Sequence, residues 1–348
     1  MFLALVAGAF ALYLAGLRLV ARRNTAVAWV VGVAAAVQLA PFAGPLLLSS
    51  DAWTYWGYAR LDNPYVDVPA DRPDDVSYRW VGERWRDTPS VYGPAFTLAT
   101  EPIGAINSPA VAAWTFRLLA AGALLVCVLL AARAGPLAAA LVGWNPVLAV
   151  HAAGGGHNDA WMGALVLAAL AFGSSHRRQP AGVAWALGTF VKWVPIVLLP
   201  LRALEARARR REVGHLGFAV GAVALVLLST AVYGRGWVES FGPLARNVGD
   251  TTSYSLAHRL TQLAVPETVA FVVVAALFVG GYVWLVRSAV RGRARLGLAA
   301  CLLVACSPYV APWYLAWVVP LAAVDDDRAA RIFALLLCAY LLPQTIPL

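Results

Sequence analysis

Long stretches without charge dominate this chain, and short polar segments separate them. A helix of about 20 apolar residues is long enough to cross a lipid bilayer. Ten apolar runs, several of them shorter than a full crossing, predict an all-α, polytopic membrane protein. The runs cover residues 2–20, 26–49, 110–132, 137–151, 159–174, 181–201, 214–233, 267–287, 296–324 and 330–347.

Two of these runs do not fit a single crossing. Run 296–324 is long enough for a broken hairpin. Run 181–201 has arginines on both flanks, so one crossing would place a basic cluster on the wrong side of the membrane. Two half-helices broken at Lys192-Trp193-Val194-Pro195 would place both flanks on one side, because proline interrupts the helical hydrogen-bond ladder. Broken helices of this kind usually line a cavity.

Composition supports the membrane class and excludes a separate soluble domain of ordinary size. The chain is 61% hydrophobic and 13% charged, with a mean hydropathy of +0.70. We therefore expect one transmembrane domain over 1–348, built from about 10–11 helical segments. Run 2–20 lacks a basic start and is followed by arginines, which favours a retained span with its N-terminus outside over a cleaved signal peptide.

The net charge of +9 indicates an orientation in the membrane rather than a nucleic-acid partner. Arginines collect in short loops between apolar runs, and the positive-inside rule places such loops in the cytoplasm. Segment 50–108, the turn around His157 and stretch 234–266 are then on the outer side of the membrane. We expect lid or interfacial helices inside 50–108. The inner loops hold Arg22, Arg23, Arg133, Arg177, Arg178, Arg202, Arg207, Arg209, Arg210, Arg211, Arg287, Arg291, Arg293 and Arg295.

Asp51 stands where the chain changes from membrane-like to water-like. It opens the 50–108 segment, which holds nine of the chain's 18 acidic residues. An aspartate here could simply cap a helix at the interface. Aromatic residues follow it, however, and such rings both anchor at the headgroup level and stack on sugar faces. The position therefore indicates a site, and the nearby aromatic residues are Trp53, Tyr55, Trp56 and Tyr58.

The segment Gly154-Gly155-Gly156-His157-Asn158-Asp159 joins two short apolar runs. Glycines allow a sharp turn and close approach to a ligand, and the three polar side chains can donate and accept hydrogen bonds. A plain turn with Asn158 and Asp159 capping the next helix is the alternative. The cost of placing His157 and Asp159 at a membrane edge favours a function.

Lys192 is the only lysine among 27 basic residues, and it lies inside an apolar run. A compact ammonium suits a phosphate partner, although the side chain could instead extend to the membrane interface. His258 and Arg259 could hold a phosphate or meet lipid headgroups. In Ser307–Tyr314 prolines break a helix, and Trp313 and Tyr314 fit an interface belt or a sugar platform.

The order of these motifs carries a family resemblance. Asp51-x-x-x-Tyr55 with Arg60, Asn63-Pro64-Tyr65, Val91-Tyr92-Gly93-Pro94, Trp144-Asn145-Pro146, Gly156-His157-Asn158-Asp159, Phe190-Val191-Lys192 with Pro195, and Pro312-Trp313-Tyr314-Leu315-Ala316-Trp317 follow one another over about residues 45–320. This order resembles that of bacterial, actinobacterial-type mannosyltransferases of the GT-C class, which depend on polyprenol-phosphate-mannose.

The resemblance implies a GT-C-like bundle with a large first outer loop. It also implies an inverting glycosyltransferase that moves a sugar, with mannose expected, from a polyprenyl-phosphate donor in the membrane lipid to a glycan, glycolipid or other acceptor outside. A β-linked donor would then give an α-linkage. In that reading Asp51 is the catalytic base and Lys192, Arg259 and His258 bind the donor phosphate. The implied sugar- or acceptor-binding residues are Tyr55, Arg60, Tyr92, His157, Asn158, Asp159, Trp313 and Tyr314.

Other functions fit part of the pattern. Intramembrane charges and broken helices also suit a transporter or flippase of an anionic lipid-linked substrate, although no internal repeat is evident. A non-catalytic membrane subunit would not need Asp51 and Lys192 together. Carboxylates in 50–108 could hold a divalent cation, but no tight ligand spacing argues for one, and no other cofactor is indicated. The acceptor and the linkage position stay open.

Overall fold

The computed structural model describes residues 1–46, 48–242 and 251–346, and within these ranges the chain forms helices and turns but no strand. The all-α class expected from the apolar runs is confirmed. In the described ranges, four helical segments are long and apolar enough to cross a membrane. They are α1 (Phe2–Arg22), α5 with its 3₁₀ extension (Pro109–Ala134), α10 (His215–Tyr233) and α14 (Glu267–Val290).

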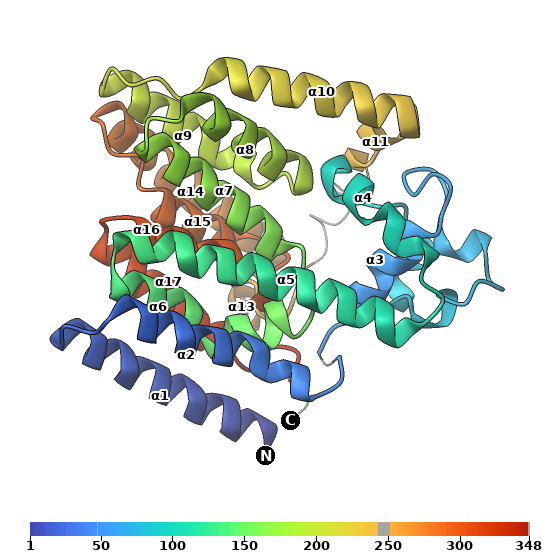
Figure 1. Cartoon of the computed structure of the whole chain (residues 1–348), viewed down its shortest axis with the longest axis horizontal. Coiled ribbons are helices and arrows are strands. Elements are labelled where there is room, and N and C mark those ends of the chain that lie inside the picture. Colours follow the sequence, from blue (N-terminus) through green and yellow to red (C-terminus); the bar gives the residue numbers. More distant parts are fainter. Residues whose placement is uncertain (47, 243–250, 347–348) are drawn as a thin grey trace.

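Shorter helices complete the bundle between these four (Figure 1). These shorter helices are α2 (Val27–Leu39), α6 (Pro136–Gly143), α7 (Asp159–Ser174), α8 (Arg178–Val191), α9 (Pro195–Ala208), α15 (Leu296–Cys306), α16 (Leu315–Val324) and α17 (Arg328–Leu341). Among them, α2, α7, α15 and α16 are apolar but below the length of a full crossing, as the sequence predicts.

The helices run between two poles, at the left and right of Figure 1. We call the end with the arginine-rich turns 175–177, 209–214 and 291–295 the basic pole. The end with segment 50–108 and turn 154–158 is the site pole. Described parts of 234–266 also lie at the site pole, where the Asn63 amide donates to the Tyr233 carbonyl oxygen at 3.1 Å. Residues 243–250 of that stretch lie outside the described ranges.

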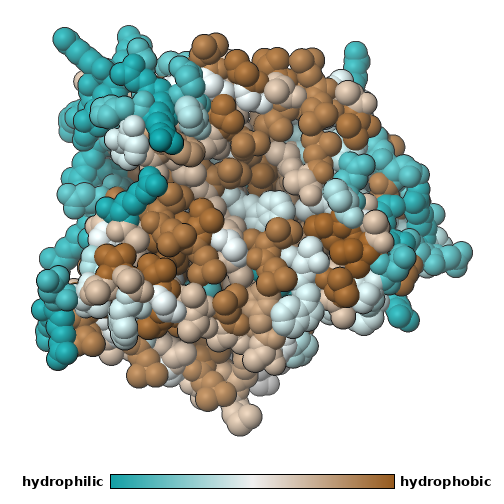
Figure 2. Space-filling model, in the orientation of Figure 1, coloured by the Kyte–Doolittle hydropathy of each residue, from teal (hydrophilic) through white to brown (hydrophobic). Residues whose placement is uncertain are grey.

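A hydrophobic band separates the two hydrophilic poles on the face shown in Figure 2. Helices α10 and α14 leave most of their apolar side chains on the surface, among them Leu216, Leu227 and Val272, each more than 60% exposed. Exposed apolar surface of this extent is stable only when lipid or another protein covers it. The chain is a multi-pass membrane protein.

Both runs that did not fit a single crossing form hairpins of two short helices. Helix α8 ends at Val191, Lys192 is extended (φ −155°, ψ 133°), and α9 begins at Pro195. Helices α15 and α16 are likewise separated by the non-helical and 3₁₀ residues 307–314. The chain therefore breaks where the sequence predicts, and each hairpin carries its turn to the site pole.

Segment 50–108 contains two helices, α3 (Asp51–Ala59) and α4 (Pro94–Thr100), joined by turns and short 3₁₀ helices. It packs onto the tip of the α8–α9 hairpin through Gly93. The Gly93 N–H donates to the Val191 carbonyl oxygen at 3.2 Å, and a Cβ at Gly93 would lie only 2.1 Å from the Phe190 carbonyl oxygen. A glycine is required for this approach, which brings Tyr92 close to the turn that holds Lys192.

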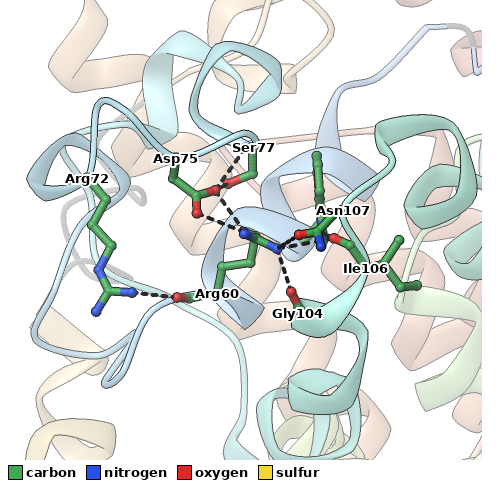
Figure 3. Close-up of polar contacts among 8 residues, drawn as sticks. Arg60, Arg72, Asp75, Ser77, Gly104, Ile106 and Asn107 are labelled. Atoms are coloured by element: carbon green, nitrogen blue, oxygen red, sulfur yellow. Dashed lines mark hydrogen bonds and ion pairs between the residues drawn. The ribbon is translucent and has the colours of Figure 1, made fainter.

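Arg60 fastens the end of α3 to both arms of segment 50–108 (Figure 3). Its Nε donates to Asp75 Oδ1 and Oδ2 at 2.8 and 2.9 Å. Its Nη1 donates to the carbonyl oxygens of Gly104 and Ile106 at 2.6 and 3.1 Å. Burial opposes ionisation of Asp75, but hydrogen bonds from Ser77 and the charge of Arg60 outweigh it and lower the pKa of that carboxyl. Arg60 thus holds α3, and with it Asp51, in place.

Candidate active site

A cavity of about 260 Å³ lies at the site pole between segment 50–108 and the turns of the two hairpins. Its walls are mostly aromatic, and its polar groups are one carboxylate and two cations besides hydroxyl groups. Such a cleft, with few polar groups converging on an apolar wall, is the usual form of a ligand site. Asp51, Tyr55, Arg84, Trp85, Tyr92, Lys192, Tyr309, Trp313, Tyr314 and Trp317 are among its lining residues.

Asp51 is the first residue of α3, and its carboxylate reaches the cavity. Its backbone N–H donates to Ser49 Oγ at 3.1 Å, and the helix N-terminus favours the negative charge. The side chain is 16% exposed, and Oδ2 lies 3.3 Å from His157 Nδ1. The carboxylate oxygens form no hydrogen bond with the side chains or backbone of the described residues, so their acceptor capacity is available to a substrate hydroxyl.

His157 and Asn158 lie buried beside Asp51 with unused hydrogen-bonding capacity. The His157 ring stacks on Trp313, with ring centroids 3.9 Å apart and an angle of 9° between the planes. Within the described part of the chain, neither ring nitrogen of His157 and neither polar atom of the Asn158 amide has a hydrogen-bond partner. The same holds for both ring nitrogens of buried His151. Buried polar groups are normally paired, so a cluster of unpaired ones beside an open carboxylate indicates a polar ligand or water.

The glycines of the 154–156 turn are needed to place His157. A Cβ at Gly155 would lie 2.5 Å from the His151 carbonyl oxygen and 2.7 Å from the His157 ring. Gly156 has a left-handed backbone (φ 71°), which side chains with a Cβ rarely adopt. The glycine run therefore allows the sharp turn that the sequence indicated, and the groups it lets come close are those of His151 and His157.

Lys192, at the wall of the cavity, forms an ion pair with Asp159 directly behind it. Lys192 Nζ donates to both Asp159 oxygens at 2.7 Å, and the Trp317 indole N–H donates to Oδ1 at 3.0 Å. The Asp159 side chain is fully buried, whereas that of Lys192 is 19% exposed. The ammonium also lies 4.9 Å from the centre of the Tyr314 ring. These contacts fix the ammonium at the cavity wall, where its remaining donor can meet an anion.

Arg84 is a second cation on the cavity wall, and sequence analysis did not single it out. Its guanidinium lies 5.4 Å from the Trp85 ring and 5.0 Å from the Tyr309 ring. The signal in the sequence is the alternation of cations and an aromatic residue in Arg84-Trp85-Arg86. Arginine stacked on aromatic rings keeps its planar donors in a fixed direction, which suits phosphate.

The structure brings most of the predicted site residues together, but not all of them. Asp51, Tyr55, Tyr92, Lys192, Trp313 and Tyr314 line the cavity, and His157, Asn158 and Asp159 lie directly behind it. Arg60 instead holds segment 50–108 together.

His258 and Arg259 lie on α13 (Leu256–Gln262), outside the cavity lining. Arg259 donates to the Tyr340 hydroxyl at 3.0 Å and to Gln262 Oε1 at 2.9 Å, and His258 contacts Gln262 as well. Among the described residues, no three His, Cys, Asp or Glu side chains gather as a metal-binding group.

Comparisons with known proteins agree with the motif order. A family model described as alpha-(1->6)-mannopyranosyltransferase, N-terminal domain, matches residues 1–207. A second, described as MptB C-terminal domain, matches residues 247–347. No solved structure matches the chain.

Three curated proteins are similar to this chain at 23–25% identity. A probable alpha-(1->6)-mannopyranosyltransferase of Mycolicibacterium smegmatis is 25% identical over 80% of this chain and 62% of its own length. Alpha-(1->6)-mannopyranosyltransferase B of Corynebacterium glutamicum is 25% identical over 80% of this chain and 56% of its own length. An alpha-(1->6)-mannopyranosyltransferase of Mycobacterium tuberculosis is 23% identical over 84% of this chain and 65% of its own length. The match thus spans less than two thirds of each relative. Because the first family model covers more than half of its residues, the chain belongs to the alpha-(1->6)-mannopyranosyltransferase family, which confirms the family resemblance seen in its motifs.

Proposed function

We propose that this protein is an inverting mannosyltransferase that transfers mannose from a polyprenyl-phosphate donor to a hydroxyl group of a glycan or glycolipid. The observation that carries the proposal is one cavity lined both by the open carboxylate of Asp51 and by the cations Lys192 and Arg84. A base and a phosphate-binding pair are the two elements that such a transfer requires. The printed names of the three relatives support mannose as the sugar.

In this mechanism Asp51 accepts the proton of the acceptor hydroxyl as its oxygen attacks the anomeric carbon. The bond between that carbon and the phosphate oxygen breaks, and its electron pair leaves with the polyprenyl phosphate. Lys192 and Arg84 stabilise the negative charge that grows on the phosphate. Attack from the face opposite the phosphate inverts the anomeric centre, so a β-linked donor gives an α-linked product.

The residues around Asp51 would orient the sugar and the acceptor. Tyr55, Tyr92, Trp313 and Tyr314 provide aromatic faces on the cavity wall, and such faces stack on sugar rings. The unpaired polar atoms of His157 and Asn158 would find partners in sugar hydroxyl groups if a rotamer change exposes them. The mechanism does not use His258 and Arg259, because they lie outside this cavity.

We treat residues 1–348 as one catalytic unit. Asp51 and Lys192 lie in the segment matched by the first family model, and Tyr309 and Trp313 lie in the segment matched by the second. Since all four line the same cavity, neither segment would form it alone.

We further propose that the site pole faces the outside of a bacterial plasma membrane, because the arginine-rich turns at the opposite pole favour the cytoplasm. Single cysteines at Val66 and Ser174, in a background without the native cysteines, test this. Both positions are exposed, one at each pole. In intact cells an impermeant thiol reagent should label the Val66→Cys variant alone, and labelling of Ser174→Cys alone would invert the orientation.

The activity itself is tested with purified protein in nanodiscs and a defined polyprenyl-phospho-mannose donor. Release of polyprenyl phosphate together with a mannosylated acceptor is the expected result, and envelope glycans from a strain lacking the protein provide the acceptors to try. In liposomes, movement of the intact donor between leaflets without loss of its sugar would support the transporter or flippase alternative and contradict the proposal.

A further inference from the structure

A second, larger cavity lies at the basic pole, far along the helices from Asp51. Its volume is about 620 Å³, within the range of sites that take small ligands. The cavity lies among the ends of α5, α7, α9, α15 and α16 and the turn that follows α9. Six arginines line it: Arg133, Arg178, Arg202, Arg210, Arg211 and Arg295.

Half of these arginines have carboxylate partners. Arg178 pairs with Glu212 at 2.5 Å, Arg202 pairs with Glu205, and Arg295 lies 3.3 Å from Asp327. The lining carboxylates Glu205 and Glu212 are therefore already engaged. The third, Asp325, accepts a hydrogen bond from the Gly297 N–H at 3.1 Å.

The other three arginines, Arg133, Arg210 and Arg211, make no ion pair with any residue that the structure describes. They come from two separate parts of the chain, the end of α5 and the turn after α9. Carbonyl ends of α5, α7 and α16 reach the same cavity, and these partial charges attract cations only over the last turn of each helix. Asp325 and the end of α9 offset part of the charge as well, but the lining still holds six arginines against three carboxylates and keeps an excess of positive charge.

Two arginines of the cavity have left-handed backbones, Arg210 with φ 52° and Arg295 with φ 49°. These backbones belong to helix ends and not to a ligand site: Arg210 closes α9, where the Arg211 N–H donates to the Ala206 carbonyl oxygen at 2.8 Å, and Arg295 precedes α15. The hollow itself distinguishes this cluster, because a general excess of positive charge at the cytoplasmic end, as the positive-inside rule describes, needs no hollow. Arg22 and Arg23 satisfy the same rule on an exposed turn outside the cavity.

We propose that this cavity binds a phosphate group, carried either by an anionic phospholipid headgroup or by a soluble phosphate compound. Arginine binds phosphate oxygens with two parallel donors, and several arginines around one hollow can surround a tetrahedral anion. The position at one end of the hydrophobic band suits a lipid headgroup, since basic clusters next to spanning helices bind anionic lipids. The site is independent of the transfer proposed at Asp51.

Binding is measured with two probes at fixed ionic strength. Inorganic pyrophosphate is titrated into the purified full-length protein in neutral detergent, and phosphatidylglycerol is titrated against a phosphatidylcholine background and detected by native mass spectrometry. We expect saturable binding of at least one probe. If phosphatidylglycerol binds and pyrophosphate does not, the phosphate group comes from a lipid headgroup. If pyrophosphate binds and displaces phosphatidylglycerol, the cavity takes a soluble phosphate compound.

The variant Arg210→Gln/Arg211→Gln removes two of the unpaired charges, and Arg22→Gln/Arg23→Gln removes the same charge from the same pole outside the cavity. We expect the first to weaken binding about tenfold or more and the second to leave it within about twofold, because only the first removes phosphate contacts. Arg133→Gln, on a different segment, gives the same test if the turn variant does not fold. Failure of both probes to saturate the wild-type protein, or equal loss in the cavity and control variants, would overturn the proposal.

Discussion

Asp51 and Asp159 each begin a helix at the site pole, yet their surroundings differ sharply. Asp159 is fully buried and accepts three hydrogen bonds, two from Lys192 and one from Trp317. Asp51 is partly exposed to the cavity and has one close neighbour, His157, at 3.3 Å. The sequence presents both as acids at the edge of an apolar run, and only their contacts distinguish them.

The difference assigns them different tasks. A carboxylate whose oxygens already accept hydrogen bonds from an ammonium and an indole has little capacity left for a substrate hydroxyl, and its charge is needed to keep Lys192 in place. A carboxylate with free acceptor capacity at a cavity wall can take a proton from a bound hydroxyl. We therefore propose Asp51 as the base and Asp159 as the positioning residue of Lys192.

The largest expected effect is that of Asp51→Asn on transfer. The amide keeps the shape but cannot accept the proton, and a positioned base typically supplies about 10²–10⁴ in rate. We expect turnover to fall by that range while the melting temperature stays close to that of the wild type. Asp62→Asn is the control, because this acid lies in the same segment with its side chain 85% exposed. Near-normal turnover of Asp51→Asn would show that another group is the base.

The next largest effect is expected for substitutions of Lys192, with the rate of transfer measured as release of polyprenyl phosphate at several donor concentrations. Removing one charge that stabilises the leaving phosphate costs on the order of 10²–10³ in rate, which we expect of Lys192→Ala. Lys192→Arg keeps the charge but is larger and planar, so we expect only partial recovery. If the lysine merely extended to the membrane interface, both variants would transfer at nearly the wild-type rate.

Asp159→Asn should lower both activity and stability, unlike Asp51→Asn. The amide leaves the partly buried ammonium without its counter-charge, which lowers the melting temperature and lets Lys192 move from the cavity wall. We expect transfer to fall about tenfold, and the loss in Asp159→Asn/Lys192→Ala to be much smaller than the product of the two single losses. If the double variant loses activity by the full product of the two single losses, or if Asp159→Asn leaves stability unchanged, Asp159 does not act through Lys192 and the proposed difference between Asp51 and Asp159 is wrong.

The helices and their breaks were predictable from sequence because each depends on local chemistry. Arginines on both sides of run 181–201 and the proline at 195 require the chain to turn back, and the structure breaks between Val191 and Pro195. Run 296–324 was predicted to form a broken hairpin because it is too long for a single crossing, and the structure breaks it between α15 and α16. Some candidate site residues could also be identified from sequence, because a single lysine and a glycine-flanked histidine, Lys192 and His157, are energetically costly at a membrane edge.

The pairings within the site were not predictable, because they depend on how distant helices pack. Lys192 and Asp159 were both identified, but nothing in their spacing shows that α7 and α8 place them 2.7 Å apart. Arg60 and Arg84 illustrate the same limit within one segment. Both are arginines among aromatics and acids, yet one clamps the backbone of 50–108 and the other lines the cavity. His151 was missed because a histidine inside an apolar run gives no sign of what it faces.

The smallest expected effect concerns the attachment of Asp51 rather than its chemistry. The Arg60–Asp75 pair holds the far end of α3, and the pKa of Asp75 is lowered in the folded protein. A lowered pKa contributes stability above the pKa of the unfolded chain, about 3.9, and this contribution is lost as the pH falls through the folded value. Segment 50–108 should therefore be better ordered at pH 7 than below about pH 4.

Asp75→Asn removes this contribution at neutral pH. Because the pair is near the surface, we expect about 1 kcal/mol or less, which corresponds to amide hydrogen exchange up to about fivefold faster in segment 50–108. Exchange in α7, which begins at Asp159, should not change, and Asp71→Asn is a matched control in the same segment. The difference between Asp75→Asn and wild type should stay constant from pH 7 down to about pH 4 and shrink only below it, as the pH falls through the lowered pKa of Asp75. An equal change in α7 would mean that the Arg60–Asp75 pair supports the whole site pole rather than the helix that carries Asp51.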